Sequence, residues 1–177
     1  MATMILLPDG SNGVSSDWIV VGAGSVKNAL MFDDGVTAYV KCDDNNETMI
    51  IEFANPSVAE GDIDISAGIS VRFLSSGRST HRTTSSRVAF DYEVPSGNPQ
   101  QIAFYAATRS AFTTVNGTAR PYSDGSSAAW TYSDLEALEM KCTKAQTTEV
   151  YLSYLALEVT YKEAVSADNA TFFGANF

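Results

Sequence analysis

Short stretches of this chain alternate apolar and polar side chains, the pattern of a strand with one face on a core and one in water. Tyr39 and Lys41, for example, fall on the outward positions of one such stretch. The apolar sets that we predict to face inward are Val36, Ala38, Val40 and Cys42; Met49, Ile51 and Phe53; Ile69, Val71 and Phe73; and Val88, Phe90, Tyr92 and Val94.

Longer segments add three further predictions. The stretch 101–107 is apolar on both faces, as expected for a strand covered on both sides. Asn116-Gly117 separates two strand-like runs and predicts a hairpin, because both residues accept a positive φ. Residues 149–161 are rich in Tyr, Val and Leu and predict a long central strand, with a bulge where the apolar phase shifts.

Turn signals separate these runs at short intervals, among them Asp33-Asp34-Gly35 and Ser75-Ser76-Gly77. One helical turn is indicated near residues 133–138, where Ser133 and Glu136 have the spacing of a capping box. About ten short strands with so little helix predict an all-β fold, an antiparallel β-sandwich of the jelly-roll type.

The length of 177 residues fits one domain, and a chain of this size buries enough surface to fold without disulfides or metals. We expect a β-sandwich domain over residues 14–163, an N-terminal arm over 1–13 and a C-terminal arm over 164–177. The C-terminal arm carries Phe172, Phe173 and Phe177, which predict docking on a neighbouring subunit, with docking on the chain itself or simple disorder as the alternatives.

The formal net charge of −10 opposes binding to nucleic acid and to anionic membrane surfaces. The start Met-Ala-Thr-Met lacks a cationic leader, and no apolar run reaches membrane length. We therefore expect a protein made in a reducing cytosol, in which Cys42 and Cys142 are buried free thiols.

We find no complete catalytic motif in the sequence. Gly22-Ala23-Gly24 follows a strand-like run and suggests a dinucleotide-binding turn, but Lys27 occupies the third glycine position and strands follow strands elsewhere. His81, the single histidine, lies in a polar stretch without apolar neighbours to form a pocket. We predict a non-enzymatic protein with no catalytic residues, no cofactor and no metal.

Carboxylates cluster at predicted turns, which leaves glycoside hydrolysis and calcium binding open as weaker hypotheses. These clusters are Asp33-Asp34; Asp43-Asp44 with Glu47; and Glu60 with Asp62 and Asp64. None has EF-hand spacing, and Asp is favoured at turns for local backbone reasons. Trp18 and Trp130 could form sugar-binding platforms, but we predict core packing for both.

Positive charge is concentrated in one segment. Residues 65–90 contain no acid but several arginines, and an arginine fork pairs well with carboxylates on a partner. The candidate partner contacts in this segment are Arg78, His81, Arg82 and Arg87. The alternative is that the segment is a solvated loop without a partner.

The segment Trp130-Thr131-Tyr132-Ser133-Asp134-Leu135, followed by the long strand from Glu149, resembles the closing part of jelly-roll proteins from tailed-bacteriophage virions. The similarity extends over roughly residues 18–161 as a pattern of elements. It implies a capsid decoration (cement) protein on the virion surface, assembled in the host cytoplasm. Its partners would be the major capsid protein and copies of itself, possibly as a trimer.

The leading hypothesis from the sequence is therefore a virion decoration protein that stabilises a shell through protein–protein contacts. The alternative is a carbohydrate-binding β-sandwich module of a phage fibre or tail, used in host recognition. An enzyme with a carboxylate pair ranks third.

Overall fold

Two antiparallel sheets packed face to face make up the structure, a computed structural model that describes residues 1–32, 37–79, 87–93, 100–106, 111–121, 128–145 and 149–165. Sheet A has the order β3-β4-β11-β6-β9, with β1 also paired to β11, and sheet B has the order β2-β5-β10-β7-β8. The strands are β1 (Ala2–Leu6), β2 (Pro8–Asn12), β3 (Ile19–Val21), β4 (Tyr39–Cys42), β5 (Thr48–Phe53), β6 (Ser70–Ser79), β7 (Arg87–Glu93), β8 (Gln100–Ala106), β9 (Thr113–Asn116), β10 (Glu139–Ala145) and β11 (Val150–Tyr161).

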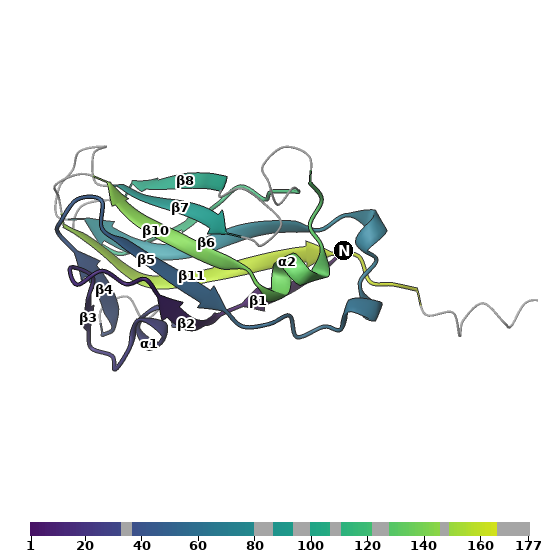
Figure 1. The fold of residues 1–177 in the computed structure, drawn as a ribbon, viewed down its shortest axis with the longest axis horizontal. Helices are drawn as coiled ribbons and strands as arrows, with labels where there is room; N and C mark the ends of the chain where they lie inside the picture. Colours follow the sequence, from purple (N-terminus) through teal and green to yellow (C-terminus); the bar gives the residue numbers. More distant parts are fainter. Residues whose placement is uncertain are drawn as a thin grey trace, which may run out of the picture.

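The strand order is that of a jelly roll. Strands β4, β11, β6 and β9 lie side by side in sheet A, and β5, β10, β7 and β8 lie side by side in sheet B. Every pairing is antiparallel, and the chain crosses between the sheets in the double Greek-key sequence of that fold (Figure 1). The predicted all-β jelly-roll class is confirmed.

The core lies between the two sheets and is built from the alternating apolar positions. Phe73 of sheet A meets Phe90 of sheet B with ring centroids 4.9 Å apart. Ile51, Phe73, Phe90 and Leu157 are fully buried, as the alternation predicts for the first three. Trp18 and Trp130 are also buried, so neither can serve as a sugar platform.

Strand β11 is central in sheet A and carries the predicted bulge. Its register with β6 shifts between Leu152 and Tyr154. Beyond the bulge, Leu155, Leu157 and Val159 continue on the inward face. The extra residue thus restores the apolar phase of a twelve-residue strand that would otherwise turn its hydrophobic side outward.

The first thirteen residues, which the sequence sets apart as an arm, contribute β1 to one sheet and β2 to the other. Met4 and Leu6 are buried against the core, and β1 pairs with β11 in register from Ala2 opposite Tyr161 to Leu6 opposite Leu157. Of the C-terminal segment, only residues 164 and 165 lie within the described part, so Phe172, Phe173 and Phe177 lie outside it.

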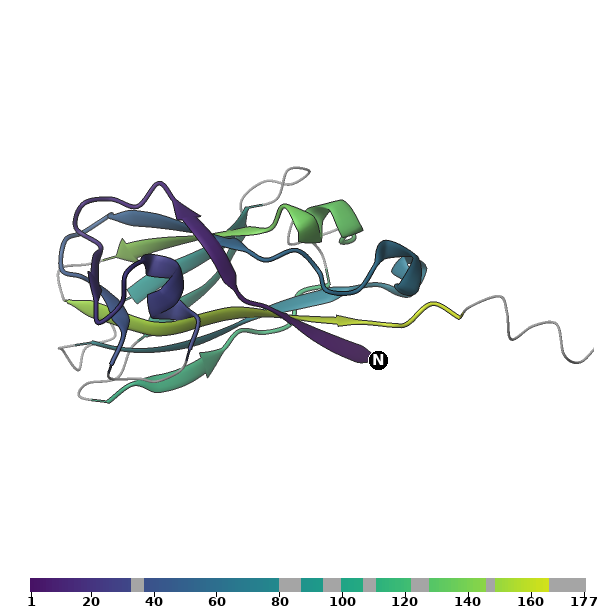
Figure 2. The ribbon, with the colours of Figure 1, turned by 90° about the horizontal axis from the view of Figure 1, so that it is seen from below.

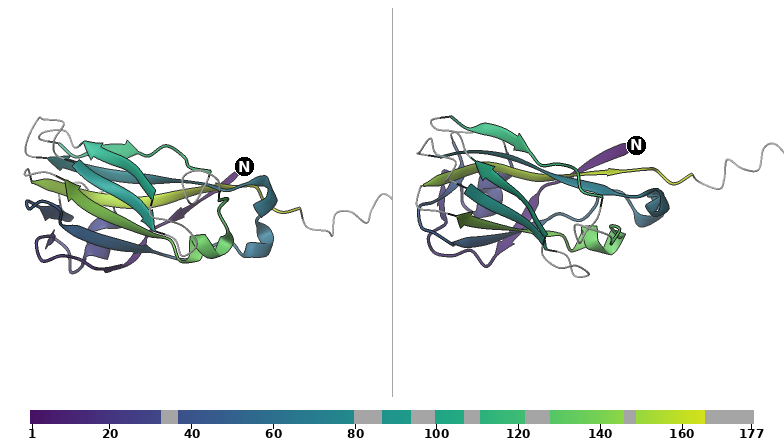
Figure 3. Two further views of the ribbon diagram at one scale, coloured as in Figure 1. Left: turned by 45° about the horizontal axis from the view of Figure 1, so that its top comes forward. Right: turned by 90° about the horizontal axis from the view of Figure 1, so that it is seen from above.

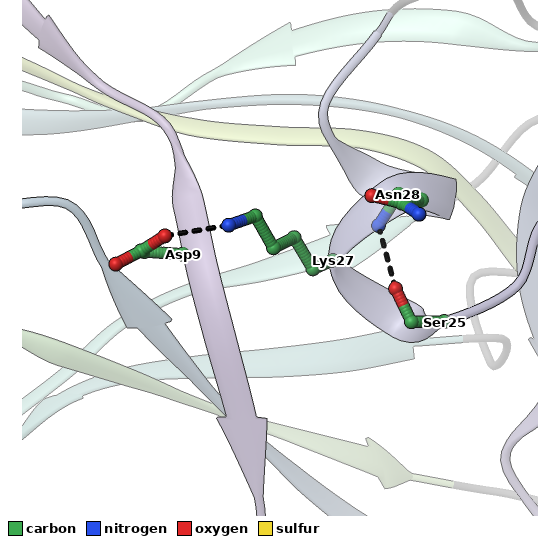
Figure 4. A network of polar contacts seen from close by, with 4 residues as sticks. All are labelled: Asp9, Ser25, Lys27 and Asn28. Atoms are coloured by element: carbon green, nitrogen blue, oxygen red, sulfur yellow. Dashed lines mark hydrogen bonds and ion pairs between the residues drawn. The ribbon is translucent and has the colours of Figure 1, made fainter.

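A short helix, α1 (Val26–Leu30), closes the side of the sandwich between β2 and β4 (Figure 2). The Ser25 hydroxyl accepts the N–H of Asn28 at 3.2 Å as the N-cap, and the Lys27 ammonium pairs with Asp9 at 2.5 Å (Figure 4). A strand, a glycine turn and a helix therefore do occur in sequence here, but within an antiparallel sheet and with Lys27 turned to β2. This arrangement supports rejecting the dinucleotide interpretation.

The helix expected near residues 133–138 is present as α2 (Tyr132–Glu136), but the predicted cap was wrong. The capping box uses Thr131 and Asp134, with Thr131 Oγ1 accepting the Asp134 N–H at 3.1 Å and Asp134 Oδ2 accepting the Thr131 N–H at 2.9 Å. Two overlapping capping sequences compete here. The one that begins at Thr131 is used, and Leu135 is buried in the core.

The predicted Asn116-Gly117 hairpin is wrong. Strand β9 pairs along β6, and the chain then continues beside β6, with an isolated bridge between Arg120 and Val71. A Cβ on Gly117 would lie 2.4 Å from the Phe73 ring. The glycine is thus required for close packing against a core aromatic, not for a turn.

The elements segregate along the sandwich. Helix α2 and two 3₁₀ turns, Glu60–Asp62 and Ile65–Ala67, gather at one end, whereas α1, β3 and β4 lie at the other (Figures 1 and 3). None of the helices in the described part has the length and apolar character needed to span a membrane.

Candidate ligand-binding face

The outward surface of sheet A carries a row of functional side chains across three strands. Lys41 of β4 lies directly opposite Tyr151 of β11, which in turn lies opposite Arg78 of β6. Residues opposite one another in antiparallel strands project to the same face. The three side chains therefore stand side by side on the outside of the sandwich.

Aromatic rings surround Arg78 in this row. Its guanidinium carbon lies 4.1 Å from the centroid of the Tyr151 ring and 5.3 Å from that of Phe112, the residue just before β9. Tyr39 of β4 completes the group, edge-on to Tyr151 at 5.5 Å and tilted to Phe112 at 6.1 Å. We call Tyr39, Arg78, Phe112 and Tyr151 the aromatic–arginine cluster.

The cluster has a buried base and a more open rim. Tyr151 is only 8% exposed, whereas Tyr39, Arg78 and Phe112 are partly exposed. The stacked guanidinium is held by cation–π attraction on Tyr151, which a desolvated ring strengthens. The rim therefore offers apolar ring surface and polar groups together at a fixed position on a rigid sheet.

Glu149 organises the polar side of the cluster. One carboxylate oxygen accepts from the Lys41 ammonium at 3.1 Å, and the other accepts from the Tyr151 hydroxyl. Burial acts to raise the pKa of Glu149, but these two hydrogen bonds outweigh it and hold the pKa below its ordinary value. Burial, followed by the bond to Glu149, raises the pKa of Tyr151 to about 12. At neutral pH the group is a carboxylate flanked by a neutral phenol and an ammonium.

Arg78 differs from Lys41 and Arg72 in forming no ion pair with a described carboxylate, although its charge helps to lower the pKa of Glu149. Among the described residues no carboxylate lies within 4.0 Å of its guanidinium, and its buried Nε has no hydrogen-bond acceptor there. Arg72, six residues earlier on β6, is paired with Glu158 at 2.7 Å. The sheet thus pairs one arginine of its outer face with a carboxylate, whereas no described carboxylate forms an ion pair with the other.

The outward face of sheet B has a different character. Glu139 of β10 lies opposite Glu52 of β5 on one side and Glu93 of β7 on the other. The Asn12 amide donates to Glu52 at 2.7 Å and to Glu139 at 3.4 Å, and Lys141 lies 3.9 Å from Glu93. Like charges directly opposite one another are unfavourable. This acidic row therefore carries an electrostatic cost in the isolated chain.

A shallow cavity of about 270 Å³ adjoins the acidic row. Its lining includes Asp9, Glu52, Glu136 and Glu139, together with part of the α2–β10 connection. In the described part of the chain, no group of three or more Asp, Glu, His or Cys residues has the arrangement needed to hold a metal ion. We therefore assign no metal site to the cavity.

The acidic turns singled out in the sequence have local structural partners. The buried Lys144 ammonium donates to the main-chain oxygens of Asp43 and Asp44 at 2.7 and 2.9 Å. Asp64 accepts from Ser66 and from Lys162, and these bonds lower its pKa. These contacts agree with the interpretation that the acids occupy these turns for local structural reasons. Asp33 and Asp34 lie outside the described residues.

Of the predicted partner contacts, Arg78 alone has a described side chain, and it lies in the cluster. His81 and Arg82 lie outside the described residues, and Arg87 begins β7 with its side chain outside them. The prediction missed Tyr39, Phe112 and Tyr151. The alternation places Tyr39 on the outward side, and an outward aromatic next to an outward lysine was the signal available. Cys42 and Cys142 are free and buried, as predicted, and burial raises the pKa of Cys42 to about 11.

Comparison with known proteins gives similarity only at the level of architecture. No family model matches, and no curated protein matches. Solved structures with a similar fold include TmCBM61 in complex with β-1,4-galactotriose (TM-score 0.47, 10% identity, 84% of this chain and 86% of that one). Another is the CBM22-1 xylan-binding domain of Xyn10C from Paenibacillus barcinonensis (TM-score 0.42, 11% identity, 90% and 98%).

A third similar structure is a carbohydrate esterase, vb_24B_21, from the Shiga toxin-encoding bacteriophage phi24B (TM-score 0.41, 12% identity, 85% and 89%). Similarities of this size do not transfer a ligand or an activity to this chain. No capsid decoration protein is among these three structures, and the virion role, its partners and its location stay predictions.

Proposed function

We propose that this protein is a non-enzymatic carbohydrate-binding jelly-roll domain whose ligand binds on the aromatic–arginine cluster of sheet A. The observation that carries the proposal is the arrangement of Tyr39, Arg78 and Phe112 around the buried Tyr151 ring on an outward sheet face.

Sugars need two kinds of surface at once. Their C–H faces pack on aromatic rings, and their hydroxyl groups need nearby donors and acceptors. The cluster offers both, because partly exposed Tyr39 and Phe112 lie beside the Lys41–Glu149 ion pair, whose side chains are 32% and 23% exposed. Preorganised, largely apolar sites with a few fixed polar groups are typical of ligand-binding positions.

A glycan array followed by titration of the best ligand tests this proposal. Tyr39→Ala and Phe112→Ala should each weaken binding at least tenfold, because each removes ring surface from the rim. The matched control is Phe32→Ala, since Phe32 is an exposed aromatic outside the cluster and its removal should leave the affinity unchanged. No sugar binding by the folded protein, or equal loss in the control, would overturn the proposal.

The virion decoration role is a second candidate, favoured by one observation. Tyr and Arg are the residues that most often dominate protein–protein interfaces, and the cluster combines them on one open face. Under this candidate the protein should add to decoration-deficient capsids, and Arg78→Ala should prevent the addition. Failure of the wild type to co-sediment with such capsids would count against it.

A further inference from the structure

The cluster carries excess positive charge on a strongly acidic protein. Glu149 is the carboxylate that pairs with Lys41, and both of its oxygens are already engaged, by Lys41 and by the Tyr151 hydroxyl. The chain as a whole carries a formal charge of −10. Arg78 is therefore a cation on an acidic protein that forms no ion pair with any described carboxylate.

The guanidinium of Arg78 is also fixed in place. Stacking on Tyr151 and Phe112 restricts its planar fork, so little side-chain freedom remains to be lost when a ligand binds. A planar fork with parallel N–H donors matches the two oxygens of a carboxylate. By contrast, the Nε of Arg72 on the same face already donates to the Glu158 carboxylate at 2.7 Å.

Resting on the proposed function, we infer that the ligand is an acidic saccharide, one with a uronic or sialic acid residue whose carboxylate pairs with Arg78. The sugar ring of the same residue packs against the aromatic rim. Charge complementarity selects this class over neutral sugars, because a carboxylate supplies the negative charge that no described residue places within 4.0 Å of the Arg78 guanidinium.

Isothermal titration with a matched ligand pair tests the inference. The acidic probe is a glucuronic-acid oligosaccharide, and the neutral probe is the same oligosaccharide with its carboxyl groups reduced to hydroxymethyl. The wild type should bind the acidic probe at least tenfold more tightly. Arg78→Gln should abolish this preference, and Arg78→Lys should restore part of it, because lysine keeps the charge but loses the fork.

Arg72→Gln is the matched control, since it removes an arginine from the same strand and face but outside the cluster, and it should keep the preference. Circular dichroism establishes that each variant is folded. Equal affinity for both probes overturns the inference but leaves the proposed function standing. Binding of neither probe, nor of any glycan on the array, overturns both. Binding of poly-aspartate as tight as that of the acidic sugar also overturns the inference, because charge alone would then be recognised.

Discussion

The Arg78 guanidinium stacks on the Tyr151 ring at 4.1 Å, and the hydroxyl of the same tyrosine donates to Glu149. One aromatic side chain thus connects the cation of the proposed site to its carboxylate. The stability of this arrangement depends on the ionisation of Glu149, which can be measured.

The pKa of Glu149 is lowered in the fold from its ordinary value of 4.5, despite partial burial, by hydrogen bonds from Tyr151 and Lys41. A lowered pKa adds stability that is present above the ordinary value and is lost as pH falls through the folded value. Glu149→Gln should therefore lose less stability than the wild type between about pH 7 and pH 3, as measured by urea unfolding.

Asp91→Asn is a control for which we expect the opposite change in stability as the pH falls. Burial raises its pKa, so the wild type regains stability as this carboxyl protonates in acid. Asp91→Asn should steepen the acid-induced loss relative to the wild type. The same slope in all three proteins would contradict the assigned hydrogen bonds.

The buried Lys144 ammonium should be a major support of the acidic turn after β4. Lys144→Met leaves the main-chain oxygens of Asp43 and Asp44 without this donor, and we expect a loss of about 2 kcal/mol in unfolding free energy. Lys141→Met, on the same strand but with a long and exposed ion pair, should cost under about 0.5 kcal/mol. Equal effects would show that burial of Lys144 has no energetic consequence.

Neutralising Glu139, the middle residue of the acidic row on sheet B, should reduce the electrostatic repulsion within the row. Glu139→Gln removes the charge that lies between Glu52 and Glu93 in the strand register, and should stabilise the fold by about 0.5 kcal/mol at low salt. Because salt screens exposed charges, the gain should shrink as ionic strength rises. A destabilised variant, measured by thermal unfolding, would mean that the bonds from Asn12 to Glu52 and Glu139 outweigh the repulsion within the row.

Gly117 should not tolerate a methyl group. A Cβ there would lie 2.4 Å from the Phe73 ring, so Gly117→Ala should cost about 1–3 kcal/mol. Gly61→Ala is the matched control, because a Cβ at that position meets nothing within 4 Å. If Gly117→Ala unfolds in urea like the wild type, the close approach of Gly117 to Phe73 is not as described.

The sequence predicted those structural features that depend on residues close together in the chain. Alternation identified the inward faces of β5 and β7, and the shift of apolar phase in the last strand predicted a bulge, which the structure has between Leu152 and Tyr154. Burial of both tryptophans and both cysteines followed from their apolar character. These features depend on side-chain hydrophobicity along a single strand, which is visible in one chain.

Features that depend on a partner strand could not be predicted in this way. Ser75-Ser76-Gly77 resembles a turn, but β6 runs through it, and the bulge of β11 lies opposite Ser76 and Gly77. Pairing across the sheet overrides local turn preference there. The same holds for the proposed site, because residues 39, 78, 112 and 151 come together only through the order β4-β11-β6-β9.

The most direct test of the central claim is a chemical-shift map of the protein titrated with the best glycan from the array. The account predicts that shifts concentrate on Tyr39, Arg78, Phe112 and Lys41 of sheet A. Shifts centred instead on the acidic row around Glu139 of sheet B, or no shifts at saturating sugar, would contradict it.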